Sequence, residues 1–130
     1  MPGQVNNFTM QKTVLIVDDN ALNVKLFCDL LGSHGYETLH AADGAAGLAL
    51  AQTHRPGLII MDLEMPVMCG REAIGRVKQD SILRSIPVIA VSAFSANGEM
   101  ETLNNGGYDA YLEKPIRAQP FLDTVRRFLA

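Results

Sequence analysis

The chain has 130 residues, of which 48% are hydrophobic and 19% charged, and its formal net charge at neutral pH is −3. This length and composition are typical of one globular domain, and the acidic balance argues against a surface that binds nucleic acid. No uninterrupted apolar stretch approaches the ~18 residues of a membrane-spanning helix, which argues against a function inside a membrane.

Residues 1–11 come first, and they lack the basic start and apolar core of a secretory signal. We expect them to form a flexible leader before a single domain over residues 12–130. Cys28 and Cys69 have neither metal-ligand spacing nor the density of a disulfide scaffold. A reduced, cytoplasmic setting is therefore expected.

The domain alternates predicted strands with predicted helices. Runs rich in β-branched and aliphatic residues predict five strands: 13–17, 36–41, 58–62, 87–92 and 108–112. Apolar residues at helical spacing predict five helices: 21 to near 35, 45 to near 54, 72–78, 96–106 and 121 to the end. The fourth helix is poor, because it is rich in glycine and asparagine. This alternation with short connections predicts an α/β fold, a doubly wound five-stranded parallel sheet with helices on both faces.

Polar side chains end several of the predicted strands. Asp18 and Asp19 follow the first strand, and Asp62 ends the third. Ser92 ends the fourth strand, and Lys114 comes shortly after the fifth. Because the carboxyl ends of parallel strands meet at one edge of a sheet, we expect these side chains to converge there.

The chemistry of this group points to phosphoryl transfer. Three carboxylates in a small space repel one another unless a cation neutralises them, and oxygen ligands favour a hard divalent ion such as Mg²⁺. A hydroxyl and an ammonium beside that ion suit a phosphoryl group, which has several negative oxygens. Aspartate can act as a nucleophile that forms an aspartyl phosphate. The sequence therefore predicts magnesium-assisted phosphoryl transfer to Asp62.

Each of these residues also has a simpler explanation when it is taken alone. Asp18 or Asn20 could cap the first helix, because aspartate and asparagine are preferred there. Ser92 could be an ordinary strand-end hydroxyl, Tyr111 an edge-strand aromatic, and Lys114–Pro115 a turn. Only their joint occurrence favours the site. The histidines show no metal-ligand spacing and are interpreted as surface or helix-end residues: His34, His40 and His54.

Four segments carry motifs in a recognisable order: Val14–Asn20, Ile60–Pro66, Val91–Ala93 and Tyr111–Pro115. Together they resemble the receiver domains of bacterial two-component response regulators, and the likeness extends over residues 12–130. The resemblance implies a flavodoxin-like (βα)5 receiver fold with strand order 2-1-3-4-5. Residues 20–27 and 35–39 are similar, more narrowly, to DivK-type single-domain regulators of bacterial cell-cycle signalling.

The resemblance implies a phosphoacceptor regulator of a two-component phosphorelay in the bacterial cytoplasm. Asp62 would accept a phosphoryl group from a histidine kinase or a His phosphotransfer protein. The implied cofactor is Mg²⁺ or Mn²⁺. Its implied direct ligands are Asp19, Asp62 and the backbone carbonyl of Glu64, and Asp18 would reach it through water.

The resemblance also implies how the signal leaves the site. Lys114 would pair with one phosphoryl oxygen and Ser92 would hydrogen-bond another, and Tyr111 would turn inward as Ser92 moves. The surface formed by 96–106, 108–112 and the last helix would then change and control a protein partner. The Lys114–Pro115 bond is expected to be cis. The kinase is expected to dock around the same edge, at Ala21, Leu22, Asn23, Pro115 and Ile116. The Ala/Leu stripe on the first helix could equally belong to the core.

Such a regulator is no enzyme beyond catalysing its own phosphorylation and dephosphorylation, and a monomer or weak dimer is expected. Three alternatives stay open. One is a receiver domain excised from a larger hybrid kinase or multi-domain regulator. Another is an aspartyl-nucleophile phosphatase of the haloacid-dehalogenase type, which would carry aspartate where Glu64 stands. The third is a flavin-binding module, for which the first loop lacks the phosphate cradle rich in serine, threonine and glycine.

Three residues depart from the family pattern. Cys69 stands before Gly70, where receivers often carry aspartate, and a redox role for it is the weaker interpretation. Glu64 adds a carboxylate side chain beside the site, and Phe94 adds a bulky apolar group near its mouth. We expect these last two residues to alter the lifetime of the aspartyl phosphate, in a direction that the residues alone do not indicate.

Overall fold

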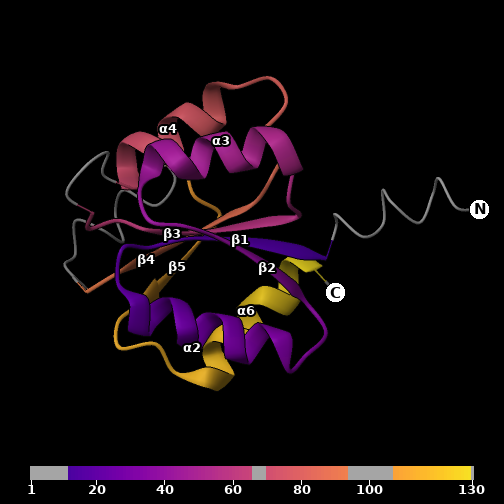
Figure 1. Cartoon of the computed structure of the whole chain (residues 1–130), viewed down its shortest axis with the longest axis vertical. Coiled ribbons are helices and arrows are strands. Elements are labelled where there is room, and N and C mark those ends of the chain that lie inside the picture. The colour runs from indigo at the N-terminus through magenta and orange to yellow at the C-terminus, as the bar shows by residue number, and fades with distance from the viewer. Residues whose placement is uncertain (1–11, 66–69, 94–106, 130) are drawn as a thin grey trace, which may run out of the picture.

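A five-stranded parallel sheet runs through the protein, with its strands in the order β2-β1-β3-β4-β5 (Figure 1). The strands are β1 (Thr13–Val17), β2 (Glu37–Ala41), β3 (Leu58–Asp62), β4 (Val88–Ser92) and β5 (Ala110–Glu113). This computed structural model describes residues 12–65, 70–93 and 107–129. The α/β class, the parallel pairing and the order 2-1-3-4-5 predicted from the sequence are confirmed.

In the described part of the chain, two helices cover each face of the sheet (Figure 1). One face carries α2 (Ala21–Gly32) and α6 (Ala118–Leu129), and the other carries α3 (Gly44–His54) and α4 (Gly70–Gln79). The predicted leader at 1–11 and the predicted helix at 96–106 lie outside the described residues. None of the described helices combines the length and the apolar character that crossing a membrane requires.

β1 is buried along its whole length and separates two hydrophobic cores. Successive side chains of a strand point to opposite faces, so Val14 and Ile16 enter one core while Leu15 and Val17 enter the other. The first core is completed from α2 and α6 by Phe27, Leu31, Phe121 and Val125. The second is completed from α3 and α4 by Ala51, Ala73, Ile74 and Val77. Burial of each large side chain stabilises the fold by roughly 1.5–3 kcal/mol. This packing on both faces holds the carboxyl ends of the strands in place.

Side chains and turns set the ends of the first helices. Asn20 is the N-cap of α2, because its side chain accepts the Asn23 N–H at 3.0 Å. Asp43 caps α3 by accepting the Ala46 N–H at 2.8 Å. α2 ends at Gly32, earlier than predicted, because the chain turns at Gly35, whose φ of 88° lies in the left-handed region. The capping explanation therefore holds for Asn20 and not for Asp18.

Three other elements differ from the predicted ranges by more than one residue. The sequence predicts a strand from Tyr108, but Tyr108 is buried in the core between the sheet and α4, and β5 begins at Ala110. Ahead of β5, the Asp109 carboxylate accepts hydrogen bonds from the Val88 N–H at 2.8 Å and the Lys78 ammonium at 3.2 Å. α6 begins at Ala118, ahead of the predicted start at 121, and it can include Pro120 because proline is tolerated in the first turn of a helix. α4 extends beyond the predicted 72–78 at both ends.

Gly47 lets α3 approach β1 closely, and it provides a test of this packing. A Cβ atom at Gly47 would lie 2.8 Å from Val17 Cγ2 and 3.1 Å from its Cγ1, whereas a Cβ at Gly75 in α4 would meet nothing within 4 Å. We expect Gly47→Ala to lower the free energy of unfolding by about 1–2 kcal/mol, because overpacking outweighs the gain in helix propensity. Gly75→Ala should raise it by about 0.5–1 kcal/mol. Urea unfolding followed by circular dichroism measures both, and equal stability of the two variants would contradict the close contact.

Candidate functional site

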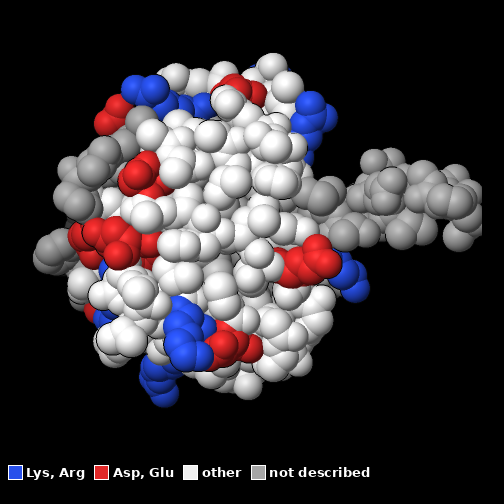
Figure 2. Space-filling view, in the orientation of Figure 1, with Lys and Arg blue, Asp and Glu red and all other residues white. Residues whose placement is uncertain are grey.

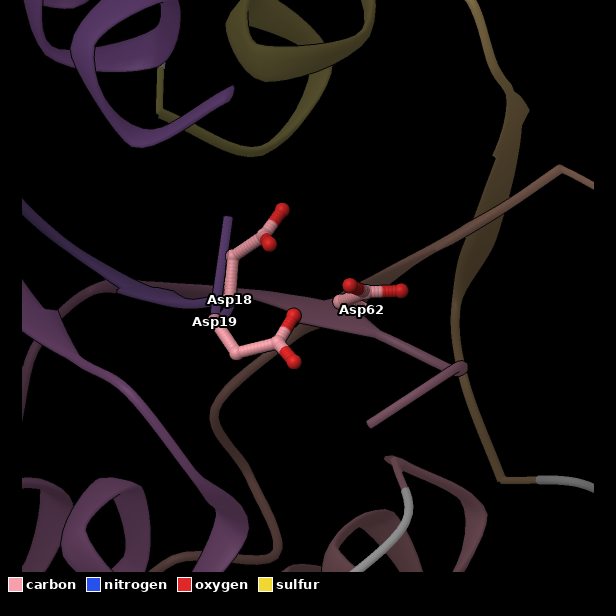
Figure 3. A group of neighbouring side chains, drawn as sticks. All are labelled: Asp18, Asp19 and Asp62. Atoms are coloured by element: carbon pink, nitrogen blue, oxygen red, sulfur yellow. The ribbon is translucent and has the colours of Figure 1, made fainter. Parts of the chain in front are cut away.

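The polar residues at the strand ends meet at one edge of the sheet, as predicted. Asp18 and Asp19 follow β1, and Asp62 is the last residue of β3. Oxygen atoms of these three carboxylates lie within 4.8 Å of one another (Figure 3). Asp18 and Asp62 are each 2% exposed, while Asp19 is exposed. Figure 2 shows acidic side chains gathered at the edge of the molecule where β1 leads into α2.

Asp18 is held in place by the start of α2. Its Oδ1 accepts the Asn20 N–H at 2.8 Å, and its Oδ2 accepts a hydrogen bond from the Asn23 side chain at 3.4 Å. The Asp18 N–H donates to the carbonyl of Ala41 at 3.0 Å, and His40 Nε2 lies 3.2 Å from the Asp18 carbonyl oxygen. The sequence predicts Asn23 only as a docking residue. Its contact with Asp18 could have been inferred from its place in the first turn of the helix that follows the acidic pair.

Asp62 is a buried carboxylate with two donors on one oxygen. Its Oδ1 accepts the Glu64 N–H at 2.9 Å and the Lys114 ammonium at 3.2 Å. Burial raises the pKa of Asp62, and the nearby charge of Asp18 adds to this, while the two donors oppose it. The net result is a pKa of about 6. A positive charge added near Asp62 would therefore stabilise its ionised form.

Lys114 lies across the site from the carboxylates, directly after β5. Burial acts to lower the pKa of its ammonium, but the hydrogen bond with Asp62 and the charges of Asp62, Asp18 and Glu64 outweigh it and raise the pKa. Lys114 is therefore a fixed positive charge. The Lys114–Pro115 bond is cis, as the resemblance to receiver domains implies.

The Glu64 side chain joins the site in a way that the sequence does not predict. The Ser92 hydroxyl donates to Glu64 Oε2, and the Ala93 N–H donates to Oε1 at 3.0 Å. Lys114 Nζ lies 3.8 Å from Oε1. The sequence assigns Glu64 a role through its backbone carbonyl and notes its carboxylate only as a departure. A carboxylate two residues beyond Asp62, on the edge where Ser92 and Lys114 converge, is the signal that could have indicated these contacts.

Tyr111 on β5 lies beside this group. Burial raises the pKa of its hydroxyl, a hydrogen bond with the Ser92 side chain opposes this, and the charges of Glu113 and Glu64 add to it. Its ring centroid lies 6.3 Å from that of Tyr108. Tyr111 is thus placed next to Ser92, where the predicted switch requires it, and its rotation stays a prediction.

The predicted docking residues lie on the surface near the site. Leu22 is 79% exposed, so this part of α2 does not belong to the core. Ala21 is exposed and Asn23 half-buried. Pro115 and Ile116 line a surface pocket of about 460 Å³ together with Lys114, Arg117, Pro120 and Phe121. Cys69 and Phe94 lie outside the described residues, and the histidines join no acidic or metal-ligating group among those that are described.

The donor set fits a hard divalent cation. All three clustered side chains offer carboxylate oxygens, the ligands that Mg²⁺ prefers, and two of them are buried. Lys114 forms an ion pair with one of these buried carboxylates, Asp62. Buried like charges are costly unless a cation neutralises them. The fold and this site define a class of protein, the α/β signalling domains that accept a phosphoryl group on an aspartate at the carboxyl edge of a parallel sheet.

Comparison with known proteins gives the family. Residues 14–126 match the response regulator receiver domain, and the chain belongs to that family. It is 47% identical over 120 residues to the polar-differentiation response regulator DivK of Brucella anthropi, covering 92% of this chain and 98% of that protein. DivK of Brucella ovis is 46% identical over the same shares. The chain is a phosphoacceptor response regulator of two-component signalling, and neither the phosphatase nor the flavin-binding alternative is favoured.

Solved structures agree with this family. The chemotaxis protein CheY4 of Vibrio cholerae superposes with a TM-score of 0.84 at 32% identity, covering 90% of this chain and 98% of that one. The receiver domain of a Pseudomonas aeruginosa sensor histidine kinase, solved with a magnesium ion coordinated in its active-site cleft, superposes with a TM-score of 0.82 at 29% identity. It covers 90% of this chain and 96% of that one. Receiver domains are typically signalling proteins and not enzymes, and they interact with histidine kinases and downstream targets.

Proposed function

We propose that Asp62 is the phosphoryl acceptor of this receiver domain. The observation that carries the proposal is a carboxylate 2% exposed, at the end of the central strand, with the Lys114 ammonium 3.2 Å away and two further carboxylates beside it. In this arrangement Lys114 pairs with a phosphoryl oxygen and Ser92 hydrogen-bonds another. Tyr111 reports the change by following Ser92.

The bonds that change in the transfer step belong to Asp62 and to the phosphohistidine donor. A carboxylate oxygen of Asp62 attacks the phosphorus of a phosphohistidine, a new O–P bond forms, and the N–P bond breaks. The histidine nitrogen keeps the electron pair of the broken bond. Lys114 balances negative charge on the phosphoryl oxygens as they approach. Burial of Asp62 keeps most water away from its carboxylate.

Asp19, Asp62 and the carbonyl of Glu64 would hold Mg²⁺ or Mn²⁺ directly, and Asp18 would hold it through water. When bound, the ion supplies positive charge that neutralises the carboxylates and the phosphoryl oxygens. The proposal is supported by the acidic cluster and by the magnesium ion in the cleft of the Pseudomonas aeruginosa receiver domain.

We further propose that the protein works in a phosphorelay of polar differentiation or cell-cycle control. The identity of 46–47% to the DivK proteins, over nearly the whole length of both chains, supports this. In this proposal residues 12–130 form the receiver domain and residues 1–11 a leader. The chain catalyses only its own phosphorylation and dephosphorylation, and a kinase or His phosphotransfer protein docks near Leu22 and Ile116.

Phosphorylation of Asp62 can be tested with acetyl phosphate and with candidate histidine kinases. We expect wild type to gain the mass of one phosphoryl group in Mg²⁺ and to gain none in EDTA. Asp62→Asn should abolish labelling, because an amide is not a nucleophile of this kind. Asp123→Asn is a matched control, since Asp123 is an exposed carboxylate on α6 whose partners among the described residues are Gln119 and Arg126 of the same helix. Intact-protein mass spectrometry measures all three proteins.

Two results would contradict these assignments. A label that persists in Asp62→Asn would show that another residue is the acceptor. Wild type that stays unlabelled with every small donor and kinase, in Mg²⁺, would contradict phosphoacceptor function in this chain.

A further inference from the structure

The Glu64 carboxylate is bound by donors that come from two other segments of the chain. Ser92 at the end of β4 donates its hydroxyl to Oε2, and the next residue, Ala93, donates its backbone N–H to Oε1 at 3.0 Å. Lys114, after β5, places its ammonium 3.8 Å from Oε1. Ser92 is fully buried and the Glu64 side chain is 30% exposed, so the Glu64 carboxylate reaches the buried Ser92 hydroxyl from the solvent side of the site.

One of these donors, Lys114, also faces Asp62, and in the proposed function Ser92 hydrogen-bonds a phosphoryl oxygen there. Lys114 Nζ lies 3.2 Å from Asp62 Oδ1, so one ammonium serves both carboxylates. A hydroxyl and a backbone N–H each have a single proton to donate. A phosphoryl group on Asp62 would bring a charge of about −1.5 to −2 and three strong acceptor oxygens to these donors. The Glu64 carboxylate and the phosphoryl oxygens cannot both use them.

We propose that Glu64 is an internal anion that competes with the phosphoryl group for Ser92, Ala93 and Lys114. This inference rests on the proposed function, because it concerns the group that Asp62 accepts. Its consequence has a direction. Before the phosphoryl group can bind its donors, the Glu64 carboxylate must leave them and move to solvent, so Glu64 weakens the hold of the site on a phosphoryl group.

The competition also reaches the switch residues. Ser92 contacts Glu64 through its hydroxyl and is hydrogen-bonded to Tyr111. When a phosphoryl oxygen replaces the Glu64 carboxylate, Ser92 exchanges one anionic partner for another. Glu64 thus sets the state of Ser92 and Tyr111 before phosphorylation, and not only the charge of the site.

Beryllium fluoride, a non-covalent mimic of the phosphoryl group, tests the competition directly. We expect Glu64→Ala and Glu64→Gln to bind BeF₃⁻ about 10-fold tighter than wild type in saturating Mg²⁺, since a charge-assisted competitor is removed. Glu113→Gln is the matched control. Glu113 lies opposite Ser92 in the sheet, and its carboxylate accepts no hydrogen bond from the described residues. It should change the affinity by less than about twofold, because exposed charges act weakly. Fluorine NMR titration measures each Kd.

A second readout needs neither metal nor mimic. In EDTA, the Ala93 amide should exchange with solvent about 10-fold faster in Glu64→Ala than in wild type, because Ala93 is exposed and its N–H loses its acceptor. The exchange rate in Glu113→Gln should equal that of wild type. Hydrogen exchange followed by NMR measures this rate.

The outcomes separate this inference from the proposed function. Unchanged or weaker BeF₃⁻ binding in the Glu64 variants, or equal tightening in Glu113→Gln, would overturn the competition and leave the acceptor role of Asp62 intact. An unchanged Ala93 exchange rate in Glu64→Ala would overturn it as well. Failure of every variant and of wild type to bind BeF₃⁻ with Mg²⁺ would overturn both.

Discussion

Asp19→Asn should lower the affinity for Mg²⁺ by about 100-fold or more while leaving the fold intact. Asp19 is exposed, and among the described residues its carboxylate makes no hydrogen bond, so its loss removes no internal contact. Asparagine keeps the size and one oxygen of the side chain but not the charge. Of the two remaining carboxylates, Asp18 and Asp62, both buried, only Asp62 is proposed to contact the ion directly, so the variant loses one of two direct carboxylate ligands.

Isothermal titration with Mg²⁺ in the absence of a phosphoryl donor measures this effect. Asp29→Asn makes the same change of charge on α2, at a carboxylate that pairs only with Lys25 in the described structure, and should bind Mg²⁺ as wild type does. Unfolding in EDTA should show Asp19→Asn within about 0.5 kcal/mol of wild type or slightly more stable, as for other surface substitutions. Wild-type affinity in Asp19→Asn would exclude Asp19 as a ligand.

The fold and the site edge could be predicted because local pattern and position coincide in this chain. β1, β3 and β4 are continuous apolar runs, and each is followed or ended by the residue that matters, Asp18, Asp62 or Ser92. Once the sheet is parallel, these residues have to share one edge. The residues themselves predict magnesium-assisted phosphoryl transfer to Asp62, but strand order, the division of direct and water-mediated metal ligands and the switch role of Tyr111 were implied only by the resemblance to receiver domains.

The contacts of single side chains could not be predicted in this way. Asn20 fits both a helix cap and a site residue by type, and only the structure shows that it caps α2 while Asp18 faces the other carboxylates. The contacts of Glu64 join three loops that are distant in sequence, and they depend on a rotamer that periodicity does not fix. The late start of β5 has a similar origin, because Asp109 is fixed by Lys78 and Val88.

Asp62→Asn should be more stable than wild type in EDTA at pH 8, by roughly 2–3 kcal/mol. In the folded protein the pKa of Asp62 is about 6, against 3.8 for the unperturbed group, and the side chain is 2% exposed. Between these two values the folded state binds more protons than the unfolded state, so the free energy of unfolding falls as the pH rises. Above pH 6 the ionised Asp62 therefore costs the folded state its full penalty, which is what asparagine removes.

The difference between variant and wild type should shrink as the pH is lowered from 7 to 4, because Asp62 becomes protonated in the folded wild type. Other groups act in the opposite direction. Backbone N–H groups of Ile82 and Leu83 lower the pKa of Asp80, so its contribution is lost on acidification, but it cancels in the comparison.

Mg²⁺ added at pH 8 should narrow the difference in stability between Asp62→Asn and wild type. A ligand that binds only the folded state stabilises it, and wild type should bind the ion more tightly than the variant, which lacks the Asp62 carboxylate. Urea unfolding across this pH range, with and without Mg²⁺, measures all three effects. A variant less stable than wild type at pH 8 in EDTA would show that the contact with Lys114 outweighs the burial of the Asp62 charge. A difference in stability that does not change with pH would show that the pKa of Asp62 is the same in the folded and unfolded states. Either result would remove the electrostatic reason for a cation at this site, whereas a gap that closes both on acidification and on adding Mg²⁺ would show that proton and metal relieve the same buried charge.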